Sequence, residues 1–169
     1  MKVSMVIAPA LIAVLVGGIT TPTPKRNAPF ARSTQSVTEA TLEHGDFATA
    51  MSAAETAYRQ ATREARWESL IQVGDAYNRI AAQAGAPAVA GKRAWDAYEA
   101  ALSNARRAER LDGVLRAAEG FAQLGDAAEV ESTLHVARAL AGTDPEAIAD
   151  VKAAAAQLSD LLQSSRDSE

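Results

Sequence analysis

Residues 114–145 read VLRAAEGFAQLGDAAEVESTLHVARALAGTDP, and this stretch decides the fold that we expect. Apolar and small side chains recur in it at helical spacing on both sides of a break. The first stripe consists of Val114, Ala117, Ala118, Phe121 and Leu124, and the second of Val130, Leu134, Ala137 and Leu140. Gly125-Asp126 breaks the helix between the stripes, and Gly142 and Pro145 end the second one. The stretch therefore predicts an antiparallel helix pair, which needs neighbours because it cannot bury its apolar face alone.

A similar turn lies nearer the N-terminus, in His44-Gly45-Asp46-Phe47. The residues at helical spacing around it are Val37, Thr41, Ala50, Ala54 and Ala57. Gly45 takes the place that Gly125 has in the later turn, where glycine adopts backbone conformations that are costly for other residues. The aspartate after each glycine can cap the following helix. This region therefore predicts a helix pair of the same kind.

The segment between these two units predicts a middle pair. Its stripes consist of Trp67, Leu70, Val73, Gly74 and Tyr77 on the first helix and of Ala94, Tyr98 and Ala101 on the second. Ala84-Gly85-Ala86-Pro87 forms the expected turn. Gly74 costs about 1 kcal/mol relative to alanine inside a helix, so we expect a close helix crossing there. We interpret the large aromatic side chains Trp67, Tyr77, Trp95 and Tyr98 as core.

A last helix is expected over Asp144–Gln163. Asp144 suits the N-cap, and Pro145 suits the first helical position. Its apolar stripe consists of Ile148, Val151, Ala155, Leu158, Leu161 and Leu162. This pattern is typical of a helix that caps a stack of helix pairs. The polar residues 164–169 are predicted to form a disordered tail.

The chain resembles the tetratricopeptide repeat family over about residues 34–142. The matching positions are Gly74, Tyr77, Ala94, Tyr98 and Ala101 in the middle unit, Ala118, Phe121, Gly125, Leu134 and Ala137 in the third, and Gly45, Ala50 and Ala57 in the first. Thr38 and Thr41 replace the small and aromatic residues of the first unit, and Val130 stands where the third unit should have alanine. The middle unit is about eight residues longer than usual, and Gly142 replaces the closing proline.

The resemblance implies an all-α fold in which antiparallel helix hairpins stack as a short TPR-like α-solenoid with a C-terminal capping helix. Its domain would comprise residues 34–163. A generic helical bundle remains the alternative. The abundance of alanine agrees with either all-α fold, because alanine has the highest helix propensity.

Residues 1–24 have the composition of a signal peptide or signal anchor, and residues 25–33 that of a linker. An apolar run over residues 5–19 follows Lys2 and is of signal-peptide length. It lacks a clear Ala-x-Ala cleavage site, so cleavage and membrane anchorage through residues 5–19 both stay open. We expect a periplasmic or secreted protein, either free or anchored in the inner membrane.

The residues available exclude several kinds of chemistry. The chain has no cysteine and only two histidines, His44 and His135, so we expect no metal site and no cofactor. It has neither a Gly-x-Ser-x-Gly motif nor a phosphate-binding glycine loop, and we expect no enzymatic activity. The formal net charge is −4, and the basic residues of the first 32 positions leave the remainder more acidic still. That balance disfavours nucleic-acid binding.

Arginines recur at helical spacing in the body. One interpretation is an exposed, salt-bridged face, in which Glu55 lies four residues before Arg59. The other is that some of these residues line the concave groove of the solenoid and clamp a carboxylate such as a peptide C-terminus. The candidate partner-binding residues are Arg59, Arg63, Asn78, Arg79, Asn104 and Arg107.

The resemblance implies a protein or peptide partner rather than a reaction. We therefore expect an exported or membrane-anchored, non-enzymatic scaffold that mediates protein–protein interaction in the bacterial cell envelope. The alternative is a self-associating structural helical bundle that is anchored at the membrane.

Overall fold

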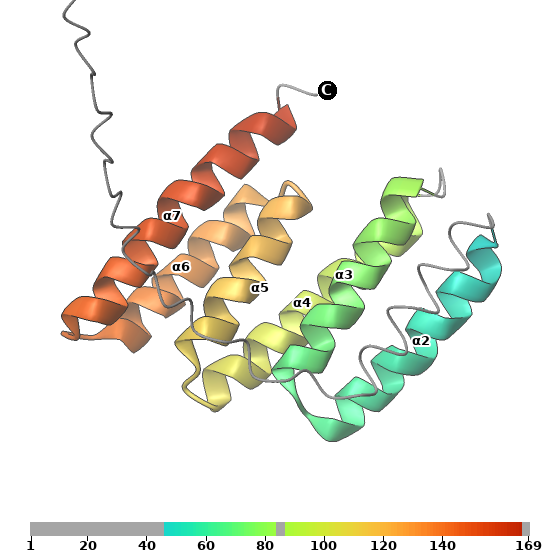
Figure 1. The fold of residues 1–169 in the computed structure, drawn as a ribbon, viewed down its shortest axis with the longest axis horizontal. Helices are drawn as coiled ribbons and strands as arrows, with labels where there is room; N and C mark the ends of the chain where they lie inside the picture. Colours follow the sequence, from blue (N-terminus) through green and yellow to red (C-terminus); the bar gives the residue numbers. More distant parts are fainter. Residues whose placement is uncertain (1–45, 84–86, 167–169) are drawn as a thin grey trace, which may run out of the picture.

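The computed structural model describes residues 46–83 and 87–166, and the described part is helical without a strand (Figure 1). The helices are α2 (Phe47–Glu64), α3 (Trp67–Gln83), α4 (Pro87–Arg107), α5 (Leu111–Gln123), α6 (Ala127–Ala141) and α7 (Pro145–Arg166). The all-α prediction is confirmed. The expected leader and linker, residues 1–33, and the first helix of the first pair lie outside the described residues.

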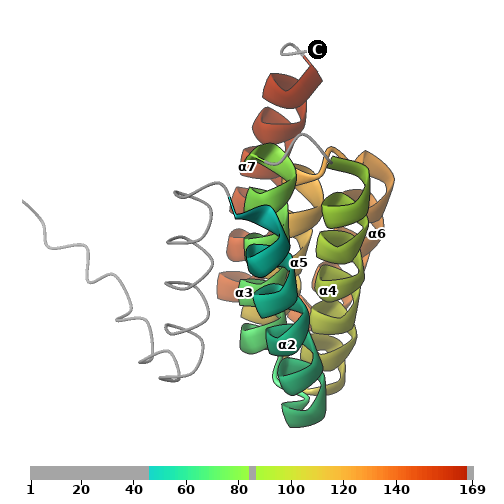
Figure 2. The same cartoon turned by 90° about the vertical axis from the view of Figure 1, so that its right-hand side faces the viewer.

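The helices pack in two layers. Each helix contacts the next along the chain, and the contacts are most extensive between α3 and α4. In addition, α5 contacts both α3 and α7, while α2 contacts α4. Figure 2 shows α3 and α7 on the left and α4 and α6 on the right. The layer that contains α3, α5 and α7 therefore presents a face of its own, without α4 and α6.

The predicted caps set the helix starts. Asp46 Oδ1 accepts a hydrogen bond from the Thr49 backbone N–H (3.0 Å), and Asp126 Oδ1 accepts one from the Glu129 N–H (3.1 Å). Gly125 between α5 and α6 has φ of +75°, the left-handed conformation that favours glycine. The third helix pair is thus confirmed, and in the first pair the capped second helix is confirmed.

The last helix begins as predicted but ends later. Asp144 Oδ1 accepts a hydrogen bond from the Glu146 N–H (3.0 Å), and Pro145 is the first helical residue. The helix then continues through Arg166, into the residues 164–169 for which we predicted a disordered tail. A polar sequence can prolong a helix as long as it contains no glycine or proline.

The core is built largely from alanine, which lets helices approach closely. On α2 and α4 the buried side chains include Ala50, Ala54, Ala57, Ala61, Ala90, Ala94, Ala97, Ala101 and Ala105. The largest fully buried residues are Tyr77, Tyr98 and Phe121, whereas Trp67 and Trp95 are partly buried. The interpretation of these aromatic residues as core is therefore confirmed, fully for the tyrosines and in part for the tryptophans.

Tyr98 fills the tightest place in this core. A Cβ atom added at Gly74 on α3 would lie 2.4 Å from Tyr98 Cε1, and one added at Gly120 on α5 would lie 2.6 Å from Cδ1. The ring also packs edge-on against Phe121, with centroids 6.0 Å apart. The close crossing expected at Gly74 is confirmed, and Gly120 on α5 makes a second close contact with the same ring.

Candidate functional site

The six candidate partner-binding residues lie on three helices. Arg59 and Arg63 are exposed on α2, Asn78 and Arg79 are partly buried on α3, and Asn104 and Arg107 lie on the last turns of α4. Arg107 donates a hydrogen bond to Asn104. Asn78 instead donates to Gln123 Oε1 on α5 (3.2 Å), and Arg59 donates to the Thr56 hydroxyl on its own helix (3.4 Å).

Polar side chains form a network between α3, α4 and α5. The Tyr98 hydroxyl donates to Asp75 Oδ1 (2.9 Å), and Arg116 Nη2 lies 2.9 Å from Asp75 Oδ2. Arg116 also pairs with Glu119 at 3.0 Å. Burial of the ring raises the pKa of the Tyr98 hydroxyl far above its ordinary value, and the Asp75 carboxylate raises this pKa further. Tyr98 is therefore held neutral and serves as a structural donor.

The same arrangement occurs one helix earlier. The Tyr77 hydroxyl on α3 donates to Glu55 Oε2 on α2 (3.0 Å), and Arg93 on α4 lies 3.7 Å from the same oxygen. Burial raises the pKa of Tyr77 as well. In both cases a carboxylate on one helix binds a tyrosine on the next and an arginine on the helix after that. Glu55 is thus directed towards α4, and the pairing that its spacing from Arg59 suggested is not the one found.

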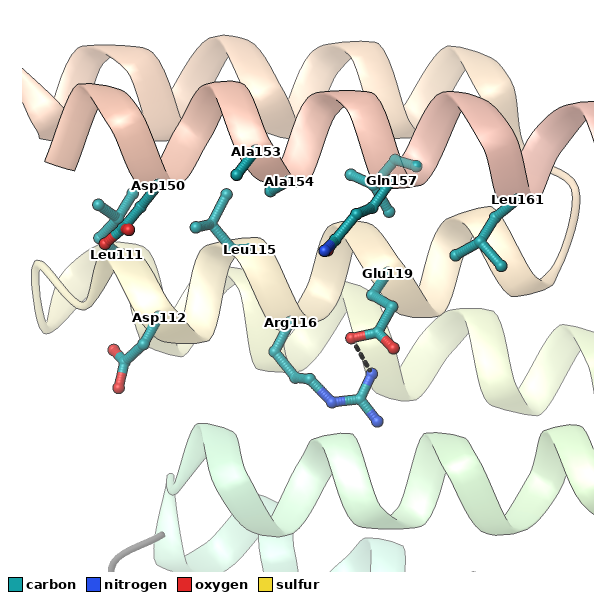
Figure 3. A pocket seen from close by; sticks show the side chains of 11 residues that line it. Leu111, Asp112, Leu115, Arg116, Glu119, Asp150, Ala153, Ala154, Gln157 and Leu161 are labelled. Atoms are coloured by element: carbon teal, nitrogen blue, oxygen red, sulfur yellow. Dashed lines mark ion pairs between the residues drawn. The ribbon is translucent and has the colours of Figure 1, made fainter. Parts of the chain in front are cut away.

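A surface groove runs between α5 and α7 (Figure 3). It encloses about 530 Å³. Its lining consists of Leu111, Asp112, Leu115, Arg116 and Glu119 from α5 and of Asp150, Ala153, Ala154, Gln157, Leu158 and Leu161 from α7. Leucine and alanine side chains make the apolar floor, and charged side chains stand along the α5 rim. The groove exists because α7 presents Ala153 and Ala154 to α5, and these side chains are too short to fill the space.

The rim of the groove is acidic. Among the described residues that line the groove, Arg116 is the one cation, and two carboxylates already neutralise it, Asp75 and Glu119. Asp112 pairs with Arg110 at 2.6 Å, outside the lining. Asp150 has no ion pair within the part of the chain that the structure describes. In Figure 3 it lies beside Leu111 at one end of the groove.

Two smaller hollows lie elsewhere. One of about 340 Å³ is lined by residues that include Gly91, Lys92 and Trp95, and one of about 240 Å³ lies beside Arg138 and Lys152 between α6 and α7. None of these three hollows is lined by any of the six candidate residues. Residues 46–83 and 87–166 contain no cluster of His, Asp or Glu that could hold a metal ion. Nor does any helix in these residues have the length and hydropathy needed to cross a membrane.

The groove does not follow from helical spacing, because spacing gives the last helix a single apolar stripe. Val151 and Leu158 of that stripe are buried, but Leu161 is 38 % exposed and lies at the groove. Leu161 therefore differs from the buried members of the stripe to which its spacing assigns it. The signal in the sequence was the alanine run 153–156, which gives α7 a second apolar face beside the first.

No protein-family model matches the chain, and a search of curated proteins finds no significant match.

Proposed function

We propose that the chain is a non-enzymatic scaffold with a TPR-like arrangement of helix hairpins, and that it holds another protein through the groove between α5 and α7. The groove is the observation that carries this proposal. It combines an apolar floor with a charged rim on the surface of a well-packed helical body. An apolar floor favours binding by burial of a partner's side chains, and a polar rim favours specificity.

The packing of the helices supports a TPR-like solenoid. Consecutive helices pair, and α3, α5 and α7 line up in one layer, as tandem hairpins do when each stacks on its neighbour. The repeated carboxylate–tyrosine–arginine networks give successive helices the same contacts. Repeat proteins of this kind generally use an extended face of the stack for binding.

The proposed location is the bacterial cell envelope, either free after export or anchored through residues 5–19. The composition of residues 1–24 supports this part of the proposal. N-terminal sequencing of the protein purified from its native cells will show whether the leader is removed. Protection of the body from protease added to intact cells, with digestion after the outer barrier is opened, is the expected result for a periplasmic protein.

Site-specific photocrosslinking in the native cells tests the scaffold function. A photoreactive phenylalanine derivative at Ala153 would place the probe in the groove, and the same residue at Ala156 is a matched control on the same helix. Both alanines are exposed, so neither substitution should disturb folding. We expect a crosslinked product with a distinct protein from Ala153 and none from Ala156.

Equal products from the two positions, or none from either, would contradict binding in the groove. A product that contains only second copies of this chain would support the self-associating bundle instead. Mass spectrometry of the product separates these outcomes, because it identifies both crosslinked peptides.

A further inference from the structure

We infer that the occupant of the α5/α7 groove is a short amphipathic helix of a partner protein, with leucine-like residues on one face and lysine or arginine beside them. The inference rests on the proposed function and deepens it by naming the chemistry of the partner. It follows from the shape of the groove, its floor and the charge of its rim.

The dimensions of the groove suit a helix. The lining on α7 extends from Asp150 to Leu161, which is roughly 17 Å along a helix axis, or about three turns. The neighbouring α5 contributes Leu111 and Leu115 over the same stretch. A helix laid between α5 and α7 would present apolar residues at positions i, i+3, i+4 and i+7 to this floor, as helices bound in grooves do.

The negative charge of the rim favours a partner with basic side chains. Within residues 46–83 and 87–166 the lining has three carboxylates, Asp112, Glu119 and Asp150, and Arg116 is the only cation. Because Arg116 forms ion pairs with both Asp75 and Glu119, its positive charge is already neutralised and would attract an acidic ligand only weakly. A basic side chain on the partner would meet Asp150, which has no cation beside it in the described part of the chain. Complementary rim charges speed association and fix orientation.

The same observations disfavour other occupants. Small-molecule sites bury most of their ligand, whereas Asp112, Asp150 and Leu161 stand exposed along this groove. A second copy that docked by two-fold symmetry would place this acidic rim against itself. An acidic peptide, or a peptide C-terminus, would meet the carboxylate of Asp150, which is unpaired among the described residues, while Arg116 is already paired with Asp75 and Glu119.

The test uses the full chain and a displayed library of random peptides of about 16 residues, long enough for roughly 24 Å of helix. Selected peptides are then synthesised, and their affinities are measured by fluorescence anisotropy against the unmodified chain and two variants. Asp150→Lys reverses a charge at the groove, and Asp160→Lys reverses another exposed charge on the same helix outside it. Circular dichroism of both variants verifies that they fold.

We expect selection of peptides with net positive charge and apolar residues at helical spacing. Asp150→Lys should weaken their binding by roughly fivefold at about 0.15 M salt, while Asp160→Lys should leave it within about twofold. A proline in the middle of a selected peptide should abolish binding, because it breaks the helix.

Peptides that bind in the groove but carry no net positive charge, or that tolerate the proline, would overturn this inference and leave the proposed function standing. Selection of no peptide that is sensitive to Asp150→Lys would also overturn it. In that case the photocrosslink from Ala153 decides the proposed function separately, since it does not depend on the partner's charge.

Discussion

The two sides of α5 show opposite uses of small residues. On the side of α3 and α4, Gly74 and Gly120 both face the ring of Tyr98, and the helices close around it without a gap. On the side of α7, Ala153 and Ala154 lie opposite Leu115 of α5 (Figure 3), and no aromatic ring of the described part of the chain fills the remaining groove of about 530 Å³. Small residues thus allow a tight helix contact where an aromatic ring fills the space between the helices. Where no such ring is present, they leave a groove.

Removal of the Tyr98 ring should cause the largest loss of stability on the side of α5 that faces α3 and α4. Tyr98→Ala should lower the free energy of unfolding by about 3–5 kcal/mol, because it leaves a cavity between three helices. Urea denaturation followed by far-UV circular dichroism measures the loss. Tyr58→Ala, at a partly buried position on α2, is the control and should cost clearly less. Equal losses of unfolding free energy in the two variants would show that the Tyr98 ring does not stabilise the packing of α3, α4 and α5.

A methyl group at the crossing is the next strongest perturbation. Gly120→Ala should cost about 1–3 kcal/mol relative to a matched control, since its Cβ would lie 2.6 Å from the Tyr98 ring. Gly91→Ala on α4 is that control, because a Cβ there has nothing within 4 Å. It should stabilise the protein by about 1 kcal/mol through helix propensity alone. Thermal and urea unfolding of both variants give the comparison, and a Gly120→Ala variant as stable as Gly91→Ala would refute the tight crossing.

Alkaline pH should lower the stability of the fold through the two buried tyrosines, Tyr77 and Tyr98. In the folded protein the pKa values of Tyr77 and Tyr98 are raised, so their neutral forms stabilise the fold at any pH below the unfolded value of about 10. Above that pH the unfolded chain loses protons that the folded chain keeps. Stability should then fall by up to about 1.4 kcal/mol per pH unit for each tyrosine.

Tyr98→Phe separates this effect from other alkaline titrations. The variant should lose stability less steeply above about pH 10, although it is less stable at neutral pH because Asp75 loses a hydrogen bond. Urea midpoints measured from neutral to alkaline pH provide the slopes. An unchanged slope would mean that Tyr98 does not keep its proton in the folded state.

The smallest effect on stability is expected in the groove. Ala154→Leu adds a side chain where there is room, so it should change the free energy of unfolding by no more than about 0.5 kcal/mol. It should nevertheless reduce the capture of groove-binding peptides, since it fills part of the floor. A destabilisation as large as that of Gly120→Ala would show that α5 and α7 are as tightly packed as α3 and α5.

The sequence predicted the helices and their order because those signals are local. Asp46, Asp126 and Asp144 each sit just before a helix whose N–H groups they bind, and glycine marks the turn at Gly125. Helical spacing also identified most of the core, including Tyr77 and Tyr98. These features depend on residues within one or two turns of each other, and a linear pattern records them fully.

The candidate site could not be obtained in the same way. Helical spacing shows which residues share a face of a helix, but it does not show what lies opposite that face. Glu55 could have paired with Arg59 on its own helix, yet the packing of α2 against α3 and α4 gives it Tyr77 and Arg93. Spacing alone points to the six candidate residues, and none of them lines the groove between α5 and α7.

Local sequence signals therefore account for an all-helical chain with capped helices, alanine-rich stripes and buried aromatic residues. Which stripe faces a large side chain depends on how the helices pack against one another. The Tyr98 ring packs against both Gly74 and Gly120, residues far apart in the chain, whereas no aromatic ring of the described residues lines the groove beside Ala153 and Ala154. The physical reason is that close packing is a property of two surfaces together, so a stripe of small residues specifies a tight contact or a groove only once its opposite face is in place.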